Sequence, residues 1–298
     1  MKMKTAAITA LCLFTLACQG MPIPIDQNAL DIASKAWEKK DAIMKTGKAL
    51  RKGFSDLTDQ EEHYIGRSVA AKILSQYKYS SDSPRTVYIN TLGSVLAKCS
   101  ARPQTFSGYH FLLIESKEVN AFAAPGGFIF VTTGLFSQLK SEEELAAVLA
   151  HEIAHVTLKH GLSAIKAANL TQAFTILGTE AAKEYGSQQV AQLTTAFEGS
   201  IDDIVNQLVV NGYSRSQEYD ADGEALRIVA RAGYDPAGLT GFLKTLDGMS
   251  KGGSGGFFKT HPPASGRLQN AQGAIKSEDL KGSEEKVRSA RFLRYAMK

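Results

Sequence analysis

The segment His151-Glu-Ile-Ala-His155 combines residue types and a spacing that can bind and use a metal ion. Positions four apart lie on one face of a helix, so His151 and His155 could hold the same ion. Neutral imidazole suits Zn²⁺, and an open coordination position lets zinc lower the pKa of its bound water to about 7. Glu152 could take a proton from that water and pass it to a leaving amine. The segment therefore predicts one zinc ion per chain and hydrolytic chemistry.

Zinc requires a third protein ligand, and the sequence narrows the choice. A histidine six residues after His155 would complete one known arrangement, but Gly161 stands there. The other arrangement takes a glutamate from a later helix, for which Glu218 is the best candidate. Asp222 would share its helix face and could accept the free ring N–H of a zinc-bound histidine. Spacing alone leaves this open, because two acidic residues could equally form a solvated helix face.

Local signals indicate the elements that position these residues. A capping box at 141–144 opens an apolar helix that runs to 160, and Gly161 ends it. Further helices are expected at 58–79, from 84, at 214–232 and at 265–275, and β-rich stretches at 109–115 and 127–132 are expected to pair. The predicted fold class is α+β and mainly helical, with a small β-sheet beside the zinc-binding helix. We interpret His63, His110 and His160 as structural, with His160 at its own helix end, where a cation is favourable.

Composition limits the class of protein. The chain has 298 residues, 44% of them hydrophobic, and its 34 basic and 30 acidic side chains give a net charge of +4. This excludes a disordered chain, and without a long Lys/Arg stripe no nucleic-acid partner is expected. After the N-terminal segment, no run of 18 or more apolar residues indicates a membrane span. We expect a spacer and peripheral helix at 18–55, one catalytic domain at 56–275 and a C-terminal tail at 276–298.

The N-terminus is typical of an export signal. Lys2 and Lys4 precede a mostly apolar run at 5–17, which is too short to span a bilayer, since about 20 residues are needed. Residues 1–17 are therefore predicted to be a signal peptide and the chain to be periplasmic. Cys18 follows as a site for lipid attachment to a membrane surface, the outer membrane being favoured. Ordinary cleavage before Cys18 is the alternative, and it would allow a disulfide between Cys18 and Cys99.

Five ordered blocks resemble the gluzincin metallopeptidases of the HtpX and CAAX-prenyl-protease type, and most closely their exported, soluble BepA- and LoiP-like bacterial members. The resemblance covers roughly residues 58–272. It implies a zincin core in which His151, His155 and Glu218 hold zinc and Glu152 is the general base. The blocks are NAFAAPGG (120–127), HEIAHVTLKHG (151–161), SRSQEYDAD (214–222), GYDP (233–236) and THPPASGRL (260–268).

The same resemblance implies further site residues. His261 is expected near the metal, where it contacts substrate or occupies the fourth zinc position, and Arg267 is expected to help order the site. Physically, either could stabilise an oxyanion, although His261 could instead cap a loop. The segment from 120 resembles a substrate-binding sheet edge, whose unpaired backbone groups could pair with any extended polypeptide, or else a buried strand and turn. The residues expected to bind substrate are Asn120, Ala121, Phe122 and Ala123.

The chain also departs from its relatives. It lacks the multi-span architecture of the membrane-embedded members and the 34-residue helical repeats of the BepA type, so neither prenylated substrates nor docking through such repeats is expected. The Gly-rich stretch at 251–256 is expected to gate the site. The predicted function is a zinc endopeptidase that degrades unfolded or misfolded envelope proteins. The alternatives are a zinc-stabilised, chaperone-like binder of extended chains and a hydrolase of cell-wall peptides.

Overall fold

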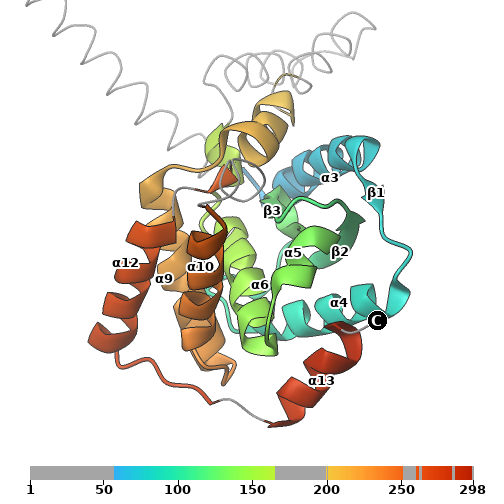
Figure 1. Ribbon diagram of the computed structural model, residues 1–298. Helices are drawn as coiled ribbons and strands as arrows, with labels where there is room; N and C mark the ends of the chain where they lie inside the picture. Colours follow the sequence, from blue (N-terminus) through green and yellow to red (C-terminus); the bar gives the residue numbers. More distant parts are fainter. Residues whose placement is uncertain are drawn as a thin grey trace, which may run out of the picture. The chain divides into compact units, whose positions relative to one another are not determined.

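The computed structural model describes residues 57–164, 199, 201–250, 260–261, 264–283 and 286–296 (Figure 1). The predicted signal peptide, Cys18, the spacer up to residue 55 and the Gly-rich stretch 251–256 lie outside these residues. The α-helices are α3 (Asp59–Gln76), α4 (Ser83–Lys98), α5 (Thr133–Gln138), α6 (Glu142–Thr157), α9 (Arg215–Arg231), α10 (Ala237–Ser250), α12 (Ala264–Ser277) and α13 (Lys286–Ala296). Shorter helical turns are η1 (Pro125–Gly127), η2 (Gly161–Ala164) and the π-helical η3 (Gln207–Asn211).

A four-stranded mixed sheet lies beside α6. Its strands are β1 (Lys78–Tyr79), β2 (His110–Glu115), β3 (Ala121–Ala124) and β4 (Phe128–Thr132), in the order β1-β2-β4-β3. The predicted pairing of 109–115 with 127–132 is confirmed, since β2 and β4 run in parallel. β3 pairs antiparallel with β4 and forms one edge of the sheet. The helix predicted across 58–79 was too long: α3 ends at Gln76, because Lys78 and Tyr79 pair with β2 instead.

Helix α6 lies at the centre of the described fold, with α9, α10 and α12 on one side and the sheet and α4 on the other (Figure 1). Its N-terminus is capped by the hydroxyl of Ser141, which accepts the Glu144 N–H at 3.2 Å; the predicted capping box is half formed, since the Glu144 carboxylate accepts the Lys140 N–H. Every residue from Glu142 to Val156 is buried. The expected mainly helical α+β fold, with its sheet beside the helix that carries His151 and His155, is therefore confirmed.

Helix α9 packs along α6 and carries Glu218 and Asp222. Its start is fixed by a capping box in which the Ser214 hydroxyl accepts the Gln217 N–H and the Gln217 side chain accepts the Ser214 N–H. Helix α12 packs against α9 and α10 and carries Arg267 in its first turns. Three helices distant in sequence therefore bring their polar side chains to the same buried region.

The first turn of α6 is bound to the C-terminal helix. Fully buried Glu142 accepts hydrogen bonds from the hydroxyls of Tyr88 at 2.7 Å and Tyr234 at 2.8 Å. The Arg291 side chain on α13 donates to the same carboxylate from Nε at 2.7 Å and also from Nη2. Burial alone would raise the pKa of Glu142, but these hydrogen bonds outweigh it and lower the pKa. Residues 276–298 thus contain a helix anchored by this ion pair and by buried Phe292.

The turn after β3 is held by α3. Gly126 has φ +73°, a left-handed conformation that glycine adopts at no steric cost, and its N–H donates to the carboxylate of Glu62 at 2.9 Å. A Cβ at Gly66 on α3 would lie only 1.8 Å from the carbonyl oxygen of Pro125. The close approach of α3 to this turn therefore depends on the missing side chain of Gly66.

We predict that Gly66→Ala lowers the free energy of unfolding by about 1–3 kcal/mol, because the new methyl group forces α3 away from the turn. Urea denaturation followed by circular dichroism measures the change. The matched control is Gly248→Ala on α10, where a Cβ meets nothing within 4 Å. In a helix interior that substitution should raise stability by roughly 0.5–1 kcal/mol. Equal effects of the two substitutions would contradict the prediction.

Candidate active site

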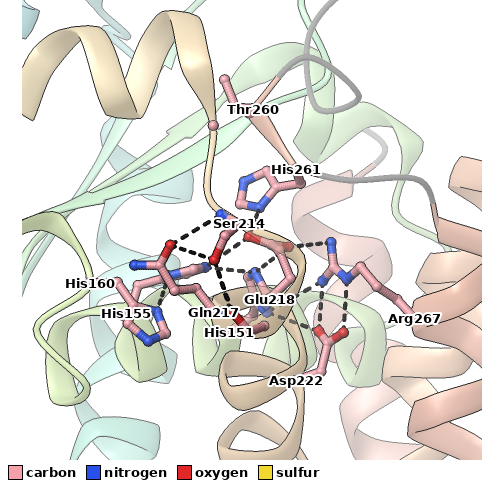
Figure 2. A network of polar contacts seen from close by, with 12 residues as sticks. His151, His155, His160, Ser214, Gln217, Glu218, Asp222, Thr260, His261 and Arg267 are labelled. Carbon is pink, nitrogen blue, oxygen red and sulfur yellow. Dashed lines mark hydrogen bonds and ion pairs between the residues drawn. The ribbon is translucent and has the colours of Figure 1, made fainter. Parts of the chain in front are cut away.

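The imidazoles of His151 and His155 converge with the carboxylate of Glu218 (Figure 2). The two Nε2 atoms are 3.1 Å apart. The Glu218 oxygens lie 3.6 Å from Nε2 of His151 and 3.5 Å from Nε2 of His155. Ligands about 2.0–2.1 Å from a tetrahedral zinc ion are roughly 3.3 Å from one another. The three side chains therefore already have the mutual spacing that a zinc ion requires.

His261 adds a fourth donor. Its Nδ1 is 2.8 Å from Oε1 of Glu218, and donor atoms of all four residues lie within 4.8 Å of one another. The neighbouring Thr260 holds this segment in place, since its hydroxyl donates to Oδ1 of Asn120 at 3.1 Å and its carbonyl accepts the Tyr213 N–H at 3.1 Å. His261 thus covers the cluster, and this buried donor set is consistent with a metal site.

Glu152 and Tyr213 point polar atoms into the same region. Glu152 is fully buried, and neither carboxylate oxygen has a hydrogen-bond partner among the described residues. Burial raises its pKa. The ring of Tyr213 stacks on His155 with centroids 4.0 Å apart, and its buried hydroxyl also lacks a partner in the described part of the chain. Such groups are costly unless a water, ion or substrate satisfies them.

Arg267 joins the two carboxylates of α9. Its Nε and Nη2 donate to Asp222 at 2.8 and 2.6 Å, and its Nη1 lies 2.7 Å from Glu218 (Figure 2). Oδ1 of Asp222 lies 3.0 Å from Nδ1 of His151. Burial alone would raise the pKa of Asp222, but the Arg267 charge outweighs it and lowers the pKa. The guanidinium is committed to the carboxylates, so the geometry favours an ordering role over contact with substrate.

His160 faces a candidate ligand, a contact that the sequence analysis missed. Its Nδ1 is 2.9 Å from Nδ1 of His155. Burial lowers the pKa of His160 to about 4, which works against the cation expected at this helix end. The position of His160 just past the end of the helix could have predicted this contact, because a residue there often folds back onto the last helical turn.

The segment 120–123 lies next to the cluster. Asn120 precedes β3 and holds Thr260, and its own N–H donates to the Thr132 hydroxyl at 3.1 Å. β3 packs against α6 on the edge of the sheet, with η3 and α3 close by. Its residues Ala121, Phe122 and Ala123 are buried. The structure therefore brings the sheet edge and the candidate metal ligands together.

A helix-borne pair of histidines, a glutamate from a second helix, and beside them a buried glutamate without a hydrogen-bond partner among the described residues are the arrangement typical of HExxH metallopeptidases. The model of peptidase family M48 matches residues 83–275. The chain therefore belongs to peptidase family M48.

Relatives share this domain over different lengths. The chain is 32% identical to the beta-barrel assembly-enhancing protease of Yersinia pestis over 63% of its own length, but it spans only 38% of that protein. It is 28% identical to metalloprotease LoiP of Escherichia coli K12, with 89% of this chain and 93% of LoiP covered. It is 27% identical to metalloprotease YcaL of the same organism, with 74% of this chain and 82% of YcaL covered. Within the described residues, no helix has the length and hydropathy to cross a membrane.

We predict that Arg267→Met lowers the free energy of unfolding by about 3–5 kcal/mol, because it leaves two buried carboxylates without their positive partner. Urea denaturation is the measurement. Arg227→Met is the control, since Arg227 pairs with Glu278 at the surface, where both side chains are over a third exposed. Its loss should cost at most about 1 kcal/mol. A small effect at Arg267 would show that the buried charges do not depend on it.

Proposed function

We propose that the chain is a zinc-dependent endopeptidase in which His151, His155 and Glu218 hold one zinc ion and Glu152 is the general base. The supporting observation is the convergence of three donors at zinc-ligand spacing beside a fully buried carboxylate without a hydrogen-bond partner among the described residues. Zinc at this position would polarise the scissile carbonyl and acidify the attacking water.

The protein side chains supply the remaining chemistry. Glu152 would accept the proton of the attacking water and deliver it to the leaving amine, and its raised pKa suits both steps. Asp222 would fix the tautomer of His151 through the contact at Nδ1, and Arg267 would keep Asp222 and Glu218 ionised and oriented. The Tyr213 hydroxyl is a candidate donor to the developing oxyanion, because it is buried and without a partner in the described structure.

The proposed substrate is unfolded or misfolded polypeptide of the cell envelope. Residues 120–123 lie at the sheet edge beside the donor cluster and are buried, so an extended chain could add there as a further strand only after a neighbouring segment moves. Backbone pairing reads little side-chain identity, so this mode suits flexible chains of varied sequence. The name of one relative, a beta-barrel assembly-enhancing protease, supports a role of this kind of protease domain in the assembly of other proteins.

The proposed location is the periplasm, with a lipid on Cys18 holding the chain at the outer membrane. It rests on the basic and apolar pattern of residues 1–17, followed directly by cysteine. Intact-mass analysis of the mature protein decides between a diacylated N-terminal Cys18 and simple cleavage.

Glu152→Gln tests the proposed chemistry, because it keeps the size and polarity of the side chain but removes the base. We expect cleavage of unfolded casein, followed by mass spectrometry, to fall by at least about 100-fold while zinc content stays at one per chain. Tyr64→Phe, at an exposed position on α3, is the control. Binding of casein without Glu152-dependent cleavage would favour the chaperone-like reading, and cleavage of purified cell-wall peptides alone would favour the cell-wall reading.

His261 is proposed to close the resting site. It contacts Glu218 at 2.8 Å while Glu152 has no exposed surface, so we expect substrate entry to require movement of the 260–261 segment. We expect His261→Ala to increase the rate of peptide cleavage with zinc retained, because a larger fraction of molecules would be open. The rate is measured with a fluorogenic peptide. A slower rate with zinc retained would instead show that His261 assists the transition state.

A further inference from the structure

The zinc-binding helix α6 ends in a way that directs one side chain back onto a candidate ligand. Lys159 has φ +55°, a left-handed conformation, and its N–H donates to the carbonyl of Val156 at 3.1 Å. The N–H of His160 donates to the carbonyl of His155 at 3.0 Å. These two bonds make a Schellman motif, in which the residue after the left-handed position meets the side chain three positions inside the helix end. Here the two residues that meet are His160 and His155.

The contact between the two imidazoles is a specific hydrogen bond. Their Nδ1 atoms are 2.9 Å apart, and both rings are buried (Figure 2). Nε2 of His155 faces the candidate metal position, 3.5 Å from Glu218. A ligand that binds through Nε2 carries its proton on Nδ1, so His155 would donate and the unprotonated Nδ1 of His160 would accept. Tyr213 stacks on the His155 ring at 4.0 Å and limits its rotation.

We propose that His160 is a positioning residue for the metal site, which accepts the Nδ1–H of His155 and thereby fixes that ligand's tautomer and ring orientation. The inference rests on the proposed role of His155 as a zinc ligand. It gives the two histidine ligands different partners, since His151 faces the carboxylate of Asp222 and His155 faces the imidazole of His160. Hydrogen-bond partners of this kind commonly change metal affinity by about 10–100-fold.

The test compares two substitutions that differ in one property. Asn offers an acceptor near the position of the histidine Nδ1, whereas Leu fills the buried volume without an acceptor. We expect His160→Leu to raise the zinc dissociation constant by about 10–100-fold and His160→Asn to stay close to the native value. Competition with a chromophoric chelator measures the zinc affinity, and urea denaturation of the zinc-free proteins measures stability separately. A packing role alone would rank the variants the other way, with Leu better tolerated than Asn.

His63→Leu is the matched control. His63 is also buried, packs against aromatic rings and has an Nδ1 without a hydrogen-bond partner among the described residues, but it does not contact the donor cluster. Its substitution should leave the zinc affinity unchanged. Native affinity in His160→Leu, or equal loss in the Asn and Leu variants, would overturn the proposal. If the native chain itself binds no zinc, the proposed zinc function fails, and the role of His160 fails with it. If the native chain binds zinc but His160→Leu binds it equally well, only the role of His160 fails.

A second measurement needs no variant and covers the case in which His160→Leu does not fold. Long-range ¹H–¹⁵N spectra of the zinc-loaded native protein report which ring nitrogen of each histidine carries a proton. We expect His155 to be protonated at Nδ1 and His160 at Nε2 only. A proton on Nδ1 of His160 would overturn the proposal, because the nitrogen that faces His155 could then not accept.

Discussion

The site depends on the ion pairs between the buried guanidinium of Arg267 and two buried carboxylates. It lies between Asp222 and Glu218, two carboxylates whose pKa burial alone would raise. Arg267 lowers the pKa of Asp222, and His261 and Arg267 together lower that of Glu218. Together with Glu152 they carry three negative charges when ionised, of which Arg267 offsets one. A divalent cation would offset the remaining two. This charge balance agrees with a donor set that already has zinc-ligand spacing.

This charge balance explains why the proposed partner of His155 is the imidazole of His160 and not a carboxylate. A carboxylate at the position of His160 would add a fourth negative charge to a region without solvent, whereas an imidazole orients the ligand without changing the net charge. If His261 closes the site as proposed, the same burial also strengthens the electrostatic contacts inside. Opening of the 260–261 segment would then control both the entry of substrate and the field that acts on it.

The sequence predicted what depends on local periodicity. The spacing of His151 and His155 and the capping box before them were sufficient to place the ligand pair on a buried helix. Glu218 was the best candidate from the residues alone, but only the resemblance decided it, because an acidic helix face looks the same whether it is solvated or buried. His160 was missed because Lys159, and not glycine, adopts the left-handed turn, and Gly161 drew attention to the wrong residue. Tyr213 carries no local signal, since its stacking on His155 exists only after α6 and the segment before α9 have packed together.

The ion pair between Glu142 and Arg291 has a consequence for the minimal autonomous folding unit. The family match ends at residue 275, yet Arg291 on α13 supplies the only guanidinium that contacts Glu142 in the described structure, at the first turn of the zinc-binding helix. A fragment trimmed to the matched boundaries would leave a buried carboxylate with two tyrosine hydroxyls and no counter-charge. The part of the chain that the family model matches is therefore shorter than the part that packs together around α6, which includes α13.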